Sequence, residues 1–229
     1  MKKKVLAVVL VIAGLTCVGM IRSTSKRQDA DQKRDRVGTY KERLQRAKAR
    51  GDKKMLSHGV IPLYAHADLD QALQIYDVII GEFVSSKSFA TDDDGNIVTW
   101  YKFKVMETLS KANMQRVVDT PPAELYPLAN DEILIWKTGG TVEVDGMEIE
   151  MTELNVPAYE QSKRYLLILA VDRARQAGTI EVGPSGALLV RPDDTMVPTV
   201  KDHIYFKREI ENRYGASVSI LREKLKKAH

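Results

Sequence analysis

The clearest alternation of hydrophobic and polar residues in this chain runs from residue 97 to residue 109. Its aromatic positions Tyr101 and Phe103 share one phase, and lysines fill the positions beside them. Successive side chains of a β-strand point to opposite faces of a sheet, so this period of two predicts a strand with one buried face. The run at 77–89 predicts a partner strand, and the polar residues 92–96 join the two strands into a long hairpin.

Shorter runs predict the remaining strands of an antiparallel fold. Asp145-Gly146 is a strong two-residue hairpin turn. The continuous apolar run at 165–171 predicts a buried central strand or barrel stave, and residues 180–190 predict a last small hairpin. The predicted strands occupy residues 77–89, 97–109, 132–137, 141–144, 147–151, 165–171, 180–182 and 187–190. We therefore expect a small β-barrel or a strongly bent sheet of antiparallel strands.

Helical patterns flank these strands on both sides. Asp68 is a suitable N-cap for a short helix that continues to Tyr76. Towards the C-terminal end, apolar positions follow a helical spacing in two runs that Gly215 separates. The expected fold is mainly β and α+β overall, with a β-barrel-like domain at 60–198 and a C-terminal helical segment at 199–229.

An apolar run without a charged residue occupies positions 5–21, directly after three lysines. This order is typical of an export signal or a membrane anchor. The run extends about 25 Å as a helix, which lies inside the tolerated range for a transmembrane span. Residues 1–22 are therefore predicted to be a signal anchor or a signal peptide, and the lipid bilayer is the first expected partner.

The candidate cleavage sites after this run are poor, which favours a retained anchor. Cys17 suggests a lipoprotein, but Thr16 stands where such a site has glycine or alanine. We expect a single anchor in the cytoplasmic membrane, with the folded domain on the extracytoplasmic side. Secretion after cleavage is the alternative. An inverted topology is also open, because Lys and Arg flank the run on both sides.

Charge is distributed unevenly along the chain, whose formal net charge is +4. Residues 22–54 carry 13 Lys and Arg against 5 Asp and Glu, whereas residues 55–229 carry 19 against 26. We predict a basic polar stalk at 23–59, partly helical, which attracts anionic lipid headgroups or serves as a solvated spacer. The folded domain is acidic and lacks the basic face of a nucleic-acid-binding domain, so no nucleic acid is expected as a partner.

A series of strand motifs follows in a fixed order. The motifs are Asp77-Val-Ile-Ile-Gly-Glu, Trp100-Tyr-Lys-Phe-Lys-Val-Met-Glu-Thr-Leu, Ile133-Leu-Ile, Gly139-Gly-Thr-Val and Lys163-Arg-Tyr-Leu-Leu-Ile-Leu. This order resembles a family of uncharacterised exported bacterial proteins. More remotely, it is similar to the OB-like barrel of netrin-type and tissue-inhibitor-of-metalloproteinase modules. The resemblance covers residues 75–200 and implies an OB-like barrel. Those modules carry disulfides, and the inhibitors depend on an N-terminal cysteine. This domain has no cysteine, so the resemblance does not imply inhibition.

The sequence offers no recognisable catalytic or metal-binding pattern. The acidic residues from Asp92 to Asn96 lack the glycine and the glutamate that an EF-hand loop needs, which favours a hairpin turn over a calcium site. The four histidines do not have the spacing of zinc ligands. Glu148 and Glu150 alternate with apolar residues, as on the solvent face of a sheet rather than in an acid–base pair. We predict no catalytic residue, no cofactor and no metal site.

Trp100 is the one candidate for a ligand-facing aromatic residue. It lies on the phase opposite to Tyr101 and Phe103, which are expected to be core residues. Trp136 and three lysines are close in the sequence, and OB-folds use aromatic side chains on a barrel face to stack on bases or sugars. The nearby lysines are Lys102, Lys104 and Lys137.

These observations favour a membrane-tethered extracytoplasmic binding or structural module that is not catalytic. Its partner is expected to be a protein or a carbohydrate that the sequence does not identify. The alternative is an exported enzyme of the hydrolase class, with a site assembled from dispersed residues. A deep pocket with converging carboxylates or histidines favours the enzyme, and an exposed aromatic face favours the binding module.

Overall fold

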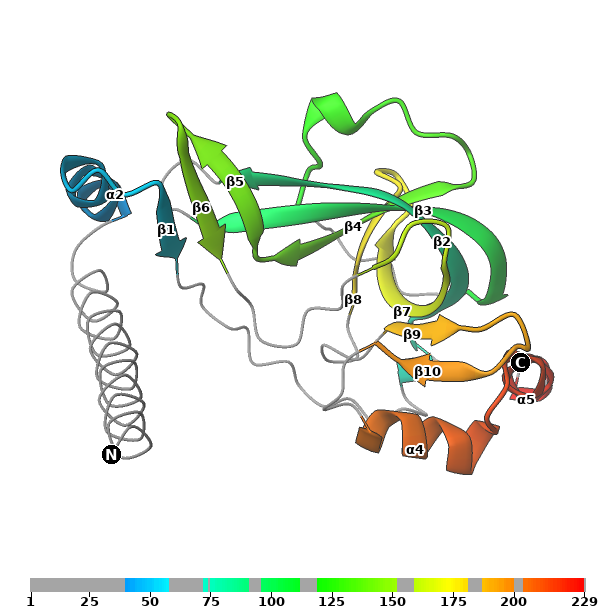
Figure 1. Ribbon diagram of the computed structural model, residues 1–229. Coiled ribbons are helices and arrows are strands. Elements are labelled where there is room, and N and C mark those ends of the chain that lie inside the picture. The colour runs from blue at the N-terminus through cyan, green and yellow to red at the C-terminus, as the bar shows by residue number, and fades with distance from the viewer. Residues whose placement is uncertain are drawn as a thin grey trace, which may run out of the picture.

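The protein is mostly β, with its strands in two sheets (Figure 1). The computed structural model describes residues 40–57, 72–73, 75–90, 96–111, 119–151, 159–180, 187–199 and 204–228. The strands are β1 (Lys54–Ser57), β2 (Asp77–Ala90), β3 (Ile97–Ser110), β4 (Glu132–Thr138), β5 (Gly140–Val144), β6 (Met147–Met151), β7 (Arg164–Asp172), β8 (Ala177–Ile180), β9 (Ala187–Val190) and β10 (Met196–Pro198). The helices are α2 (Tyr40–Ala49), the 3₁₀ turn η1 (Ala123–Leu125), α4 (Ile204–Tyr214) and α5 (Val218–Ala228).

Five strands close into a small OB-like barrel in the order β7-β2-β3-β4-β8. The closing pair is β7 with β8, which are antiparallel, while β8 runs parallel to β4. The other neighbouring pairs in the barrel are antiparallel. The expected barrel between residues 77 and 190, flanked by helices, is therefore confirmed.

The long hairpin predicted at 77–109 is formed by β2 and β3. Register shifts interrupt its pairing at three places between Val78 and Ser85. Each β-bulge of this kind bends a strand and increases its twist, which lets two long strands serve both the barrel and the extension beyond it. The extension consists of the far ends of β2, β3 and β4, and it leads towards the second sheet (Figure 1).

The small hairpin predicted at 180–190 does not form, and this prediction is wrong. β8 pairs with β4 and β7, whereas β9 pairs with β7 and β10. β9 pairs with the first half of β7, at Arg164–Leu167, and β8 pairs with the second half, at Leu169–Asp172. The side chains of β7 are buried on both faces of the sheet, as its unbroken apolar run predicts.

The barrel interior and the outer face of β7 form separate cores. Alternate residues of β7, beginning at Tyr165, point into the barrel among the side chains of Phe83 and Phe103. The residues between them, such as Leu166 and Ile168, point outwards into a second core. The expected core positions of Tyr101 and Phe103 are confirmed, since both belong to the interior cluster.

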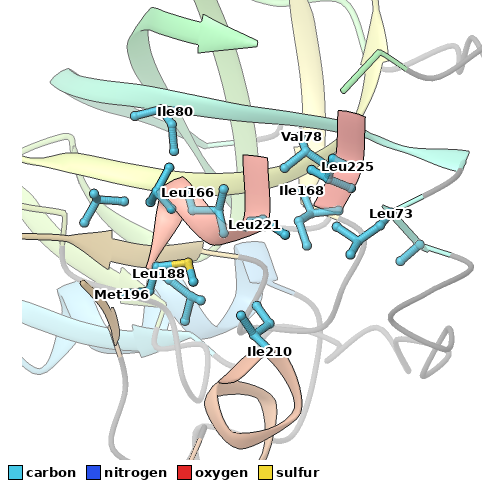
Figure 2. Packing of buried hydrophobic residues seen from close by; sticks show 13 residues of the cluster. Leu73, Val78, Ile80, Leu166, Ile168, Leu188, Met196, Ile210, Leu221 and Leu225 are labelled. Atoms are coloured by element: carbon cyan, nitrogen blue, oxygen red, sulfur yellow. The ribbon is translucent and has the colours of Figure 1, made fainter. Parts of the chain in front are cut away.

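The C-terminal helices cover this second core. Figure 2 shows Leu221 and Leu225 of α5 directed at Val78 and Ile168 of the barrel, with Ile210 of α4 in the same cluster. Both helices were predicted from their apolar spacing, and Gly215 ends α4 with a positive φ of 87°. Burial of these leucines is what holds the helical segment against the sheet.

An ion pair adds to this attachment and makes it depend on pH. The Arg222 guanidinium donates two hydrogen bonds to the carboxylate of Glu107 on β3, at 2.6 and 2.7 Å. These bonds lower the pKa of Glu107 below its ordinary value of 4.5. Because the folded-state pKa is the lower one, the pair stabilises the fold fully above that ordinary value. Its contribution is lost as the pH falls through the folded-state pKa.

Glu107→Gln is therefore expected to lower the free energy of unfolding by about 1 kcal/mol at neutral pH and by nothing in acid. Urea unfolding of both proteins across this pH range measures the difference. Glu209→Gln is the control, because the Glu209–Arg213 pair lies within α4, is 3.4 Å long and is exposed. An equal loss at every pH contradicts the assignment to the Glu107 charge.

The second sheet, in the order β1-β6-β5, packs against α2 on one side of the barrel (Figure 1). Its core contains Ala47 of α2 and Met55 of β1 together with Met147 and Ile149 of β6. Both α2 and β1 belong to the segment predicted as a partly helical stalk at 23–59. A helix with few apolar residues packs here because the sheet supplies the apolar partners that the helix lacks.

Several expectations concern residues outside the described ranges. They are the anchor at 5–21, the helix start at Asp68 and the acidic turn at 92–95. Ala72, Leu73 and Ile75 are helical, in agreement with the expected short helix. Among the residues that the structure describes, no helix is both long enough and apolar enough to cross a membrane.

Candidate functional site

An aromatic cluster lies on the outer face of the β2–β3–β4 extension. Trp100 of β3 and Trp136 of β4 are paired in register, and Phe89 of β2 is opposite Val98. Paired residues of antiparallel strands project from the same face of a sheet. The three rings therefore share one surface with Leu134, and they form a single hydrophobic cluster.

A proline-containing segment between β3 and β4 covers this surface. We call residues 119–131, which join β3 to β4, the strap. Leu125 and Leu128 of the strap pack against the aromatic cluster. They leave Trp100 only 4% exposed. The cluster is thus a closed hydrophobic core and not an open sheet face.

The expectation that Trp100 presents its ring to a ligand therefore differs from what the structure shows. Alternation assigned Trp100 correctly to the face opposite Tyr101 and Phe103, but alternation says nothing about what covers that face. The available signal was the pair Leu125 and Leu128, two large apolar side chains in a connection that contains three prolines. Buried leucines in a loop indicate that the loop packs on a hydrophobic surface.

Polar contacts hold the rim of the strap. Glu124 forms an ion pair with Lys87 of β2 at 2.6 Å, and both side chains are about half exposed. The Tyr126 hydroxyl donates to the carbonyl oxygen of Arg175 at 2.9 Å. The Gln176 amide donates to the carbonyl oxygen of residue 129 at 3.0 Å. Exposed contacts of this kind contribute about 1 kcal/mol or less each, so the apolar contacts dominate the attachment.

The lysines predicted to surround the aromatic residues separate into two groups. Lys102 and Lys104 lie on the same strand phase as Trp100, and they approach Glu132 and Asp131 at 3.5 and 3.6 Å. Lys137 is buried and lies opposite Thr99 in the register, on the other face of the extension. Only the first two lysines therefore contribute positive charge to the candidate face.

Within the described residues, one polar atom of the aromatic cluster has no hydrogen-bond partner. The indole Nε1 of Trp136 is buried, and the structure gives it no hydrogen-bond acceptor. A buried donor without an acceptor costs about 1–3 kcal/mol. The strap therefore makes apolar contacts with the aromatic cluster but gives the Trp136 indole no hydrogen-bond acceptor.

The exposed part of the site is the outer surface of the strap. Tyr126 is 39% exposed, one of the few large hydrophobic side chains on the described surface. Partial burial raises the pKa of its phenol, so the hydroxyl stays protonated at neutral pH and keeps donating to Arg175. The strap also carries Glu124 and Asp131, which pair with Lys87 and Lys104. A segment with an exposed tyrosine and charged residues suits recognition of a macromolecule.

The glutamates considered for acid–base chemistry lie elsewhere. Glu148 and Glu150 of β6 both form ion pairs with Lys54 of β1, at 2.9 and 2.5 Å. Their carboxylates raise the pKa of the Lys54 ammonium. They occupy the exposed face of the second sheet, as the alternation of their strand predicts.

The part of the chain that the structure describes holds no cluster of three or more potential metal ligands. No protein-family model matches this chain, and a comparison with curated proteins finds no match.

Proposed function

We propose that this chain is a membrane-tethered extracytoplasmic module that binds a partner or serves a structural role without catalysing a reaction. The observation that carries the proposal is the order of its parts. An apolar run at 5–21 is followed by a basic segment at 22–54, and then by residues 55–229, which carry a net negative charge. This order supports a small barrel that is tethered near a lipid surface.

The filling of the barrel supports binding at an outer surface rather than chemistry inside the barrel. The interior is filled by aromatic rings in tilted and edge-to-face contacts, with centroid separations from 5.0 to 6.4 Å. They belong to Phe83, Tyr101, Phe103, Tyr159 and Tyr165. A small barrel packed in this way is a core and not a lumen for a substrate. The exposed strap with Tyr126 is the surface that we assign to the protein or carbohydrate partner.

The position of α2 limits how far the body can stand from the membrane. Eighteen residues, 22–39, separate the apolar run from α2. Even a fully extended chain of this length spans no more than about 60 Å. The tether therefore keeps the barrel within one or two molecular diameters of the bilayer.

The basic segment divides into two parts with different roles. In the described part, Lys48 of α2 pairs with Asp145 at 2.6 Å, and Lys54 pairs with the glutamates of β6. These cations already face the acidic hairpin of β5 and β6. We assign the attraction for anionic lipid headgroups to the basic residues of 22–39, where the chain is closest to the anchor.

Membrane fractionation with N-terminal sequencing tests the tether. The full chain is expected in the membrane fraction with its N-terminus intact, and external protease should cleave the folded body. A double variant with aspartate at Val8 and Leu10 is expected to lose the membrane fraction, because charges at the centre of a span are costly. A mature chain that starts near Met20, or protection of the body from external protease, contradicts the proposal.

A pull-down from the membrane fraction tests binding. We expect the wild-type chain, captured with its anchor, to retain a partner that Tyr126→Ala releases. Leu56→Ala is the matched control, because Leu56 is similarly exposed at 37% but lies on β1, in the second sheet. Equal recovery with both variants contradicts the assignment of the partner to the strap.

A further inference from the structure

We propose that the strap is a displaceable cover and that the face beneath it binds an extended acidic peptide segment with apolar side chains. The inference rests on the proposed function as a binding module and goes beyond it, because it adds a peptide ligand for the face beneath the strap to the partner assigned to the outer surface of the strap. The strap would then be an internal pseudo-ligand that an external segment replaces.

The backbone of the strap is only loosely connected to the sheet. Within the described residues, the backbone hydrogen bonds of residues 119–128 are local ones, from the Leu125 amide to Pro122 and from the Tyr126 amide to Ala123. Residue 129, near the end of the strap, bonds to Gln176 and Glu132. The first ladder bond to β3 comes at the very end, where Val105 donates to the Asp131 carbonyl at 2.6 Å. Three of the strap residues are prolines, which have no N–H to donate. An element held mainly by side chains can open without breaking the sheet ladders.

The contacts of the strap define what an external segment must supply. Leu125 and Leu128 show that the face accepts two apolar side chains three positions apart. Glu124 shows that an acidic group reaches Lys87. Displacement of the strap would remove Glu124 from Lys87, which increases the attraction of this face for an acidic partner. The face therefore fits a short acidic and apolar peptide.

The orphan indole of Trp136 gives an external peptide an advantage over the strap. Its Nε1 has no acceptor while the strap is closed. A peptide that places a carbonyl or a carboxylate oxygen there satisfies this donor and gains a hydrogen bond that the strap does not make. The strap and the peptide would otherwise compete for the same apolar surface.

The chain has a built-in reporter for this site. Trp100 and Trp136 are its only two tryptophans, and both lie under the strap. The tryptophan fluorescence of the protein therefore comes from this cluster and reports whether the strap covers it. In the full chain, purified in detergent micelles, we expect blue-shifted emission that acrylamide quenches weakly.

Leu125→Ser combined with Leu128→Ser is expected to open the strap. The emission should shift to the red and the acrylamide quenching constant should rise at least threefold, while the far-ultraviolet circular dichroism stays unchanged. A synthetic peptide of residues 119–131 added in trans should restore the blue-shifted emission. The same peptide with lysine in place of Glu124 should restore it at least tenfold more weakly. Leu56→Ser is the matched control and should leave the emission unchanged.

Hydrogen exchange of the wild-type chain keeps the proposal testable if the double variant does not fold. The amides of Leu125 and Tyr126 are expected to exchange at least a hundredfold faster than those of Leu167 and Leu169 in β7. Equal protection at both places, or a red shift that occurs only when the circular dichroism is lost, overturns the proposal. Restoration by an oligonucleotide or an oligosaccharide instead of the peptide overturns the assigned chemistry. None of these measurements depends on membrane attachment, so they can fail while the tether is confirmed, and the reverse also holds.

Discussion

Gly140→Ala is expected to lower the free energy of unfolding by about 3 kcal/mol, because the chain turns from the barrel into the second sheet at this residue. Its φ angle is 128°, a backbone conformation that residues other than glycine rarely adopt. A Cβ atom there would lie 2.2 Å from Thr99 Oγ1 and 2.6 Å from Ser88 Oγ. Thr99 cannot move away easily, since its hydroxyl donates to the carbonyl oxygen of Gly139 at 2.5 Å.

Gly146→Ala is the matched control. Gly146 also has a positive φ, of 76°, but a Cβ atom there has no neighbour within 4 Å. We expect this variant to lose only about 1 kcal/mol, the cost of the backbone conformation alone. Urea unfolding followed by circular dichroism measures both variants. Similar losses in the two variants contradict the argument that crowding against Thr99 and Ser88 dominates at Gly140.

The sequence was sufficient for local structure wherever one signal dominated. The alternation around Tyr101 and Phe103 predicts β3 and its buried phase. The Asp145-Gly146 turn joins β5 and β6, and both turn residues have positive φ as the predicted turn requires. These features depend on neighbours in the sequence, and therefore they can be read without a structure.

Pairing between distant segments could not be predicted in the same way. β8 closes the barrel by running parallel to β4. Three other strands, β5, β6 and β7, lie between these two in the sequence. β1 consists of four residues beside a basic helix and pairs in parallel with β6. Short strands like these are specified by the partner that they find and not by their own pattern. β1 lies within the segment at 23–59 that the sequence predicts as a stalk, and its own pattern does not identify it as a strand.

The candidate site shows the same limit from another direction. The phase of Trp100 was predicted correctly, but its exposure depends on Leu125 and Leu128, which lie about twenty-five residues further along the chain. A periodic pattern shows which residues share a face, and only tertiary structure shows whether another segment covers it. The strap is therefore the feature of the site that the sequence analysis missed.

Tyr159 gives a prediction in which two substitutions at one position have very different expected effects. Its ring lies 5.0 Å from the rings of Tyr101, Phe103 and Tyr165 and 5.7 Å from that of Phe83. Tyr159→Ala removes the centre of this aromatic cluster. We expect the variant to lose about 3 kcal/mol of the free energy of unfolding, since the rings around the cavity belong to a rigid barrel.

Tyr159→Phe is expected instead to leave the stability unchanged or to raise it by about 1 kcal/mol. The residue keeps some exposed surface, but its hydroxyl oxygen is buried and has no hydrogen-bond partner in the described structure. Burial raises the pKa of this phenol well above its ordinary value of 10.0. Below pH 10.0 the phenol is neutral in both the folded and the unfolded protein, and it does not affect the pH dependence of stability. Above pH 10.0 the unfolded chain loses the proton first, and the wild-type protein therefore loses stability.

Urea unfolding of the wild type and the two Tyr159 variants, at neutral pH and in alkali, measures these effects. Tyr165→Phe is the matched control, because the Tyr165 hydroxyl accepts a hydrogen bond from the Glu160 amide at 2.8 Å. We expect this control to lose about 1 kcal/mol at neutral pH. Tyr159→Phe should match the wild type there and exceed it in alkali, where it has no phenol to ionise. An equal loss in both phenylalanine variants at neutral pH would show that the Tyr159 hydroxyl has an acceptor, contrary to the packing described for the barrel interior.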